Sequence, residues 1–187
     1  MRHPDVTGLI LAGGQSRRFG ADKARHPVEG RPMIARVYDV LAPRVASVLV
    51  SVHGPEDDYG LPAERVVDAY PGAGPLAGLH AGLARCPTPW LLALACDLPF
   101  LTSEVLEILL SARDEAARPV VAHTPDGRRQ PLCALYPRAL CATAEDRLEA
   151  GRFALHDLLR VAGPVREVPV PAAPLRNVNV QDDLLDT

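Results

Sequence analysis

The sequence predicts an α/β fold in one domain of residues 1–187, with a mostly parallel sheet, an antiparallel excursion and helices on both faces. Apolar runs typical of buried strands alternate along the chain with stretches of helical spacing. The run Trp90–Ala95 is apolar throughout, which indicates a central strand covered on both faces. Pro125, Asp126 and Gly127 form a turn signal between two strand-like segments and predict a local antiparallel pair.

The first half of the chain predicts three strands and two helices before this central strand. Residues 7–11 are an apolar run that ends at a glycine pair, as in a buried strand followed by a turn. Residues 32–41 carry apolar side chains at helical spacing, with a proline soon after. Residues 46–52 are apolar and β-branched and predict a strand, and residues 64–67 predict a weaker one. A short helix is expected at 75–83, after a glycine-rich turn.

The second half predicts more helix than strand. Residues 102–112 have an apolar helical face, and Thr102 or Ser103 can cap that helix. The antiparallel pair is expected at 120–123 and 132–136. The remaining expected elements are helices at 138–149 and 153–161, a strand at 165–170, and a closing segment at 177–186 for which a final helix is one option.

Composition and charge exclude several classes of function. The formal net charge of −3 gives no electrostatic basis for binding nucleic acid or an anionic membrane. No apolar run approaches the roughly 18 residues of a membrane span. The N-terminus has no signal-peptide pattern, so a cytoplasmic location is expected. The cysteines form no C-x-x-C pair and are expected to be free thiols, and no histidine is assigned to a metal; the cysteines are Cys86, Cys96, Cys133 and Cys141.

A glycine-rich turn with basic residues follows the first expected strand. Gly13 and Gly14 offer free main-chain N–H groups that can cradle an anion, while Arg17, Arg18 and Lys23 supply positive charge. The Walker A pattern is absent. Glycines alone would indicate only a plain turn. Glycines with three cations nearby, one of them the single lysine among 20 basic residues, favour a phosphate site.

This segment resembles the L-A-G-G-x-x-x-R-x-G-x-D-K signature of molybdenum cofactor guanylyltransferases, a branch of the nucleotidyltransferases with a Rossmann-like fold. Related cytidylyltransferases carry L-A-A-G instead, so Gly14 favours guanine over cytosine. The resemblance implies nucleotide binding by Leu11, Ala12, Gly13 and Gly14. It implies that the catalytic charges on the phosphates come from Lys23 together with Arg17, Arg18 or both.

A carboxylate follows the central strand. Asp97 is a hard oxygen ligand of the kind that Mg²⁺ takes together with substrate phosphates. An aspartate two residues before a proline also commonly caps a turn. The run from Cys96 to Leu101 resembles the C-D-x-P-F-L metal-binding strand end of the same family. The resemblance therefore implies that Asp97 is a catalytic residue that binds Mg²⁺ and nucleotide.

Further segments match the family pattern less specifically. The resemblance implies nucleotide contacts for Asp68, for Gly78 of G-P-L-A-G-L, and for Ser51, where some relatives carry asparagine. It implies substrate contacts for Gln130, although a polar residue at the start of a strand is an equally good interpretation. Asn177 and Asn179 of N-V-N are implied as a substrate-binding pair. The chain then departs from the family's T-P-E-D-L and continues V-Q-D-D-L.

The resemblance, which spans most of the chain, implies transfer of GMP from GTP to the terminal phosphate of molybdopterin with release of pyrophosphate. Cofactor-delivery or molybdoenzyme client proteins are expected partners. Three alternatives stay open: a related transferase that uses CTP or another acceptor, a non-catalytic molybdenum-cofactor carrier, and a nicotinamide-dependent oxidoreductase. The last is suggested by Gly72 and Gly74 in a G-x-G-x-x-A pattern. It is weakened by the poor preceding strand and by Pro75.

Overall fold

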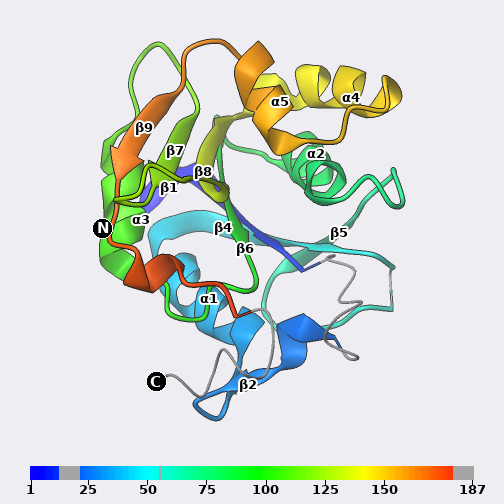
Figure 1. Cartoon of the computed structure of the whole chain (residues 1–187). Helices are drawn as coiled ribbons and strands as arrows, with labels where there is room; N and C mark the ends of the chain where they lie inside the picture. The colour runs from blue at the N-terminus through cyan, green and yellow to red at the C-terminus, as the bar shows by residue number, and fades with distance from the viewer. Residues whose placement is uncertain (13–21, 55, 179–187) are drawn as a thin grey trace.

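The computed structural model describes residues 1–12, 22–54 and 56–178. Its main sheet is built from β1 (His3–Leu11), β4 (Val45–Val52), β5 (Glu64–Val67), β6 (Trp90–Ala95), β7 (Val120–His123), β8 (Arg129–Pro137) and β9 (Arg166–Pro169). The seven strands lie in the order β5-β4-β1-β6-β8-β7-β9 (Figure 1). Strand β8 runs antiparallel to both of its neighbours, β6 and β7, whereas the other neighbouring pairs are parallel. The predicted mostly parallel sheet with an antiparallel excursion is therefore confirmed.

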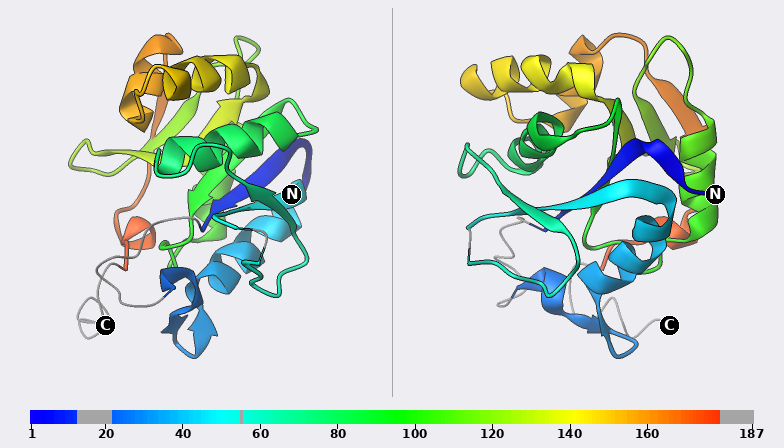
Figure 2. Two further views of the ribbon diagram at one scale, coloured as in Figure 1. Left: turned by 90° about the vertical axis from the view of Figure 1, so that its right-hand side faces the viewer. Right: turned by 180° about the vertical axis from the view of Figure 1, so that it is seen from behind.

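Helices cover both faces of this sheet, as predicted. The helices are α1 (Met33–Leu41), α2 (Pro75–Arg85), α3 (Ser103–Ser111), α4 (Cys141–Glu149) and α5 (Leu155–Val161). Helices α1 and α3 lie on one face, and α2, α4 and α5 lie on the other (Figures 1 and 2). None of the helices in the described ranges has the length and apolarity that a membrane crossing requires.

The two layers of core follow from the alternation of side chains along the strands. In β6, Leu92 and Leu94 pack with the residues of α1 and α3, whereas Leu91 and Ala93 pack with those of α2, α4 and α5. All four side chains are fully buried. The unbroken apolar run of β6 is therefore explained by helices on both of its faces.

Two glycines bring α2 unusually close to the sheet. A Cβ atom on Gly82 would lie 2.5 Å from Leu9 Cδ2, and one on Gly78 would lie 2.5 Å from Ser51 Oγ. Real Cβ atoms do not approach other atoms so closely, so a larger residue at either position would push the helix outward. The first turn of α2 is consequently held against the ends of β1 and β4.

The structure differs from the sequence-based expectations mainly at element ends. Strand β8 begins at Arg129 rather than at 132, because Pro131 lies where the β7–β8 register shifts, so its missing N–H interrupts no ladder. Thr102 occupies the N-cap of α3 but makes no capping hydrogen bond through its side chain.

Several short elements were not predicted at all. They are the hairpin of β2 (Pro27–Val28) and β3 (Arg31–Pro32) and the 3-10 turns η1 (Lys23–Arg25), η2 (Ala42–Arg44), η3 (Arg138–Leu140) and η4 (Ala173–Leu175). The option of a final helix falls largely on 179–187, which lie outside the described residues.

Candidate functional site

Most of the predicted site residues that can be located lie at one edge of the sheet, where the parallel strands end. Leu11 ends β1, Ser51 lies near the end of β4, and Asp68 directly follows β5. Asp97 comes two residues after β6. Because β8 is antiparallel to β6, its first residues, including Gln130, reach the same edge. Ligands of α/β sheets bind beyond this edge, so the topology alone gathers these residues.

The edge is held together by main-chain hydrogen bonds. Ala12 N donates to Ser51 O at 3.1 Å, and Cys96 N donates to Leu11 O at 3.2 Å. Val178 N donates to Asp97 O at 3.1 Å and so fixes the end of the described chain beside β6. The side chains of Leu11 and Ala12 are buried in the core, so these two residues offer a ligand main-chain groups only.

An ion pair between Lys23 and Asp97 is the charged centre of this edge. Lys23 Nζ lies 2.6 Å from Asp97 Oδ2, and each side chain is 16% exposed. Asp22 caps the short turn η1 by accepting a hydrogen bond from Ala24 N at 3.1 Å, which holds Lys23 in place. The single lysine of the chain and the carboxylate after the central strand, 74 residues apart, are thus in direct contact.

The second carboxylate oxygen of Asp97, Oδ1, is buried and has no hydrogen-bond partner among the described residues. A buried carboxylate oxygen without a partner is costly, so such an atom usually indicates a ligand or ion that completes it. Within the described ranges no group of three or more His, Cys, Asp or Glu residues could hold a metal by itself. Asp97 therefore fits a metal ion that is shared with substrate phosphates, not one enclosed by protein ligands.

The neighbouring thiol takes no part in this charge arrangement. Burial, together with the adjacent charge of Asp97, raises the pKa of the Cys96 thiol to about 12. The group is therefore neutral near pH 7 and is a poor nucleophile. The prediction of free thiols is confirmed for all four cysteines.

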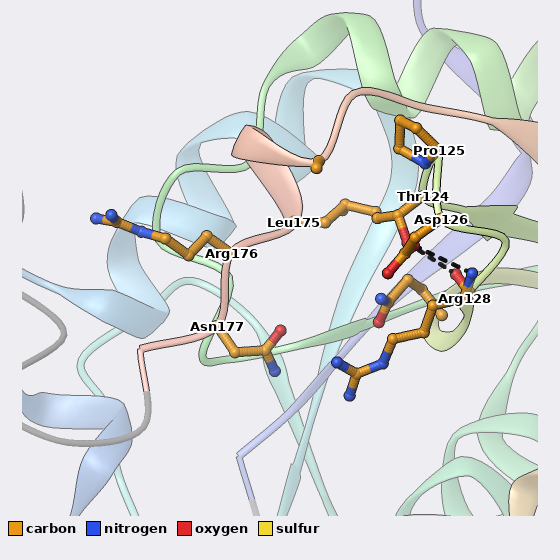
Figure 3. A pocket seen from close by; sticks show the side chains of 9 residues that line it. Thr124, Pro125, Asp126, Arg128, Leu175, Arg176 and Asn177 are labelled. Atoms are coloured by element: carbon orange, nitrogen blue, oxygen red, sulfur yellow. Dashed lines mark hydrogen bonds between the residues drawn. The ribbon is translucent and has the colours of Figure 1, made fainter.

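A pocket of about 600 Å³ lies at the β8 side of the same edge. Its lining residues are Thr124, Pro125, Asp126, Arg128, Gln130, Ala172, Leu175, Arg176 and Asn177. Figure 3 shows Arg128 and Asn177 extending into one space, whereas Arg176 extends away from both. Asn177 directly precedes Val178, whose N–H is bonded to Asp97, so the pocket adjoins the Lys23–Asp97 pair. Gln130 and Asn177, far apart in sequence, thus share one pocket, as expected for a common ligand.

Some predicted residues at this edge do not line the pocket, and others cannot be located. Ser51 is only 2% exposed and is covered by α2 at Gly78, so the structure assigns both residues a packing contact. Asp68 is partly exposed and follows β5, the edge strand. Their nucleotide contacts stay predictions. Five predicted residues lie outside the described ranges: Gly13, Gly14, Arg17, Arg18 and Asn179.

Sequence reasoning missed part of the pocket. It identified the Pro125–Asp126–Gly127 segment as a turn but gave it no further role. The turn is formed as expected, with Gly127 at φ 79° and its N–H donating to Thr124 O at 2.8 Å. It brings Arg128 to the pocket, and an arginine at the base of a turn on the ligand-binding edge was the available signal.

The chain is similar to a family of known transferases. The family model described as "MobA-like NTP transferase domain" matches residues 8–166. A molybdenum cofactor guanylyltransferase from Desulfosudis oleivorans is 34% identical over 187 residues, covering 96% of this chain and 92% of that protein. Another from Cupriavidus taiwanensis is 35% identical over 191 residues, covering 96% of this chain and 94% of that protein.

Solved structures show the same fold. The molybdopterin-guanine dinucleotide biosynthesis protein A of Archaeoglobus fulgidus superimposes with a TM-score of 0.79. The match covers 96% of this chain and 95% of that one at 23% sequence identity. At this identity the likeness speaks for the fold alone.

Proposed function

Because the chain belongs to the MobA-like NTP transferase domain family, we propose that it transfers GMP from GTP to the terminal phosphate of molybdopterin. Pyrophosphate is the second product. The observation that carries the proposal is the contact of Lys23 with Asp97 beside the pocket of Gln130 and Asn177. That arrangement offers a charged centre for phosphates next to a polar cavity for an acceptor.

The reaction is a nucleotidyl transfer. An oxygen of the molybdopterin phosphate attacks the α-phosphorus of GTP, and a new bridging P–O bond forms. The bond from the α-phosphorus to the oxygen that bridges to the β-phosphorus breaks, and pyrophosphate leaves with that electron pair. The attacking phosphate is already ionised near neutral pH, so the reaction needs positioning and charge neutralisation more than a general base.

The residues of the charged centre divide this work. Lys23 neutralises negative charge that builds up on the phosphates, with Arg17 and Arg18 in the same predicted role. Asp97 would hold Mg²⁺ through its buried Oδ1 oxygen. When bound, the ion polarises the phosphate oxygens and offsets the charge of the leaving group. Lys23 meanwhile keeps the carboxylate oriented through Oδ2.

Substrate binding is shared by the two parts of the edge. The proposed nucleotide contacts are Leu11, Ala12, Gly13, Gly14, Ser51, Asp68, Gly78, Lys23 and Asp97. The proposed acceptor contacts are Gln130, Asn177 and Asn179. The amides of Gln130 and Asn177 can both donate and accept, which suits the mixed polar edge of a pterin ring.

The proposal extends to the setting of the enzyme. We treat residues 1–187 as one nucleotidyltransferase domain. A cytoplasmic location is proposed because GTP is held there. Cofactor-delivery proteins or molybdoenzymes are the proposed clients for the finished dinucleotide.

The test is pyrophosphate release with molybdopterin, Mg²⁺ and either GTP, CTP or ATP. Release that requires the acceptor and prefers GTP is the expected result. A preference for CTP would keep the chemistry and overturn the choice of base. No release from folded protein with any nucleotide would contradict the transferase activity and favour a carrier of the cofactor.

A further inference from the structure

Two arginines adjacent in sequence, Arg128 and Arg129, differ in whether their guanidinium groups have a partner among the described residues. Arg129 is engaged by Glu167, with Nη2 2.5 Å from Oε1. The guanidinium of the preceding residue, Arg128, makes no hydrogen bond or ion pair within the described ranges, although it lines the pocket. Asp126 is the one carboxylate among the lining residues, and it accepts hydrogen bonds from Thr124 Oγ1 and Arg128 N. The hydrogen bond from Thr124 and, to a smaller extent, the charge of Arg128 lower the pKa of the Asp126 carboxyl, but no hydrogen bond or ion pair among the described residues occupies the guanidinium, so its N–H groups are available to a ligand.

The backbone of Arg128 is held firmly even though its side chain is exposed. Thr124 N donates to Arg128 O at 3.0 Å, and Thr124 Oγ1 donates to the same oxygen at 3.2 Å. Arg128 N in turn donates to Asp126 Oδ1 at 3.3 Å. With both main-chain groups fixed, less freedom is lost when the guanidinium binds a ligand, which favours recognition.

Arg128 lies farther from the sheet than Gln130, the acceptor contact proposed on β8. At the start of strand β8, Gln130 pairs with Ala122 and Arg129 pairs with His123 of β7. Arg128 comes next, opposite Thr124, and so lies farther from the sheet than Gln130. Residues two apart on a strand are separated by about 7 Å. Neither Lys23 nor Asp97 is among the residues that line the pocket of Arg128, so a ligand whose phosphate lies at the Lys23–Asp97 pair would meet Arg128 with a different group.

Molybdopterin has a second group that carries negative charge. Besides its phosphate it bears a pair of dithiolene sulfurs, which are anionic by themselves or carry an oxo-molybdenum unit. We propose that Arg128 is a specificity-determining residue for the acceptor, and that its guanidinium binds this second anionic group. The proposal rests on the proposed function. It adds a contact with the sulfur or oxo-molybdenum end of the acceptor, away from the reacting phosphate.

The test compares the Arg128→Ala variant with the wild-type protein and with Arg129→Ala. Arg129 is the matched control because it is adjacent, equally charged and engaged by Glu167. The KM for acceptor and the KM for GTP are measured under anaerobic conditions, with metal-free and with molybdenum-loaded molybdopterin. Binding of each acceptor without GTP is titrated in parallel, and thermal melting confirms that each variant is folded.

The Arg128→Ala variant is expected to raise the KM and Kd for acceptor by roughly five- to tenfold, as for one charge-assisted hydrogen bond at an exposed site. Its kcat and its KM for GTP should stay within about twofold of wild type. A loss for the loaded form alone would assign Arg128 to the oxo-metal unit, and a loss for both forms would assign it to an acceptor group that both forms carry.

Unchanged acceptor binding in Arg128→Ala, or an equal loss in Arg129→Ala, would overturn the assignment. So would an equal rise in the KM for GTP. A wild-type protein that binds acceptor but releases no pyrophosphate would instead contradict the proposed function, and the titration would still test Arg128.

Discussion

The two ends of strand β1 differ in their charged groups: ion pairs dominate where β1 begins, whereas where β1 ends the Lys23–Asp97 pair leaves Asp97 Oδ1 without a hydrogen bond from any described residue. At the edge where β1 begins, Arg113 bonds to Asp5 and its Nη2 lies 2.9 Å from His3 Nδ1. Glu107 lies 3.2 Å from the N-terminal amine and 3.4 Å from Arg44 Nε. At the edge where β1 ends, Asp97 Oδ1 and the Arg128 guanidinium have no partners within the described residues.

The difference separates stability from binding. Where β1 begins, the ion pairs connect the N-terminal strand to α3, and few of the described charged groups there stay available to bind a ligand. A polar atom without a partner, such as Asp97 Oδ1, costs stability in the free protein and is completed when a ligand or ion binds. Substitutions where β1 ends should therefore lower activity and leave the free energy of unfolding nearly unchanged. Substitutions where β1 begins should lower the free energy of unfolding and leave activity nearly unchanged.

The largest effect is expected for Asp97→Asn. The change keeps the shape of the side chain but removes the charge that Lys23 and a metal ion require, so kcat should fall by about a thousandfold or more. The melting temperature should change little. Steady-state pyrophosphate release and calorimetry measure the two quantities. A variant with nearly wild-type turnover would remove Asp97 from the proposed metal site.

An intermediate effect of the opposite kind is expected for Arg113→Ala. The side chain is 17% exposed and also donates from Nε to Leu110 O at 2.8 Å. Its loss should lower the free energy of unfolding by about 1–2 kcal/mol while kcat/KM stays unchanged. Urea unfolding and turnover are the measurements.

Arg160→Ala is the control for this change, because Arg160 is 71% exposed and its pair with Asp157 should contribute little. An Arg113→Ala variant that loses activity without losing stability would contradict the separation of the two edges.

The smallest effect concerns pH. The hydrogen bond from Arg113 holds the pKa of Asp5 below its ordinary value of 3.8. A lowered pKa stabilises the folded state above the ordinary pKa, and this contribution is lost as the pH falls through the folded value. Wild type should therefore exceed Asp5→Asn in stability at about pH 6, and the gap should narrow below about pH 4. A gap that is constant with pH would show that Asp5 acts only through neutral contacts.

Much of the fold could be read from local patterns because β6 is an unbroken apolar run and the flanking helices have apolar residues at helical spacing. The start of β8 could not, since Pro131 normally ends a ladder and only the register shift beside β7 accommodates it. The hairpin of β2 and β3 was missed for a related reason. Its strands are two residues long, contain prolines, and are joined through Glu29 at φ 49° and Gly30 at φ 77°.

The site could be predicted where a residue follows a strong strand. Asp97 is of this kind, and the structure places it in contact with Lys23, while its role stays a prediction. Arg128 could not be found in this way. Its importance depends on which arginines are paired, and pairing such as that of Arg129 with Glu167 joins residues that are 38 positions apart.

The reversed direction of β8 has a consequence for how acceptor preference could be altered by engineering. In a wholly parallel sheet, every loop at the ligand edge leads into a crossover that must return to the opposite edge before the next strand begins. Here the turn at 124–128 joins two strands directly at that edge and belongs to no helix. Its length and side chains can be exchanged without altering β1 or β6. If Arg128 contacts the acceptor as proposed, exchanging this turn should alter acceptor preference. Changes around Asp97 would instead affect the end of the central strand β6.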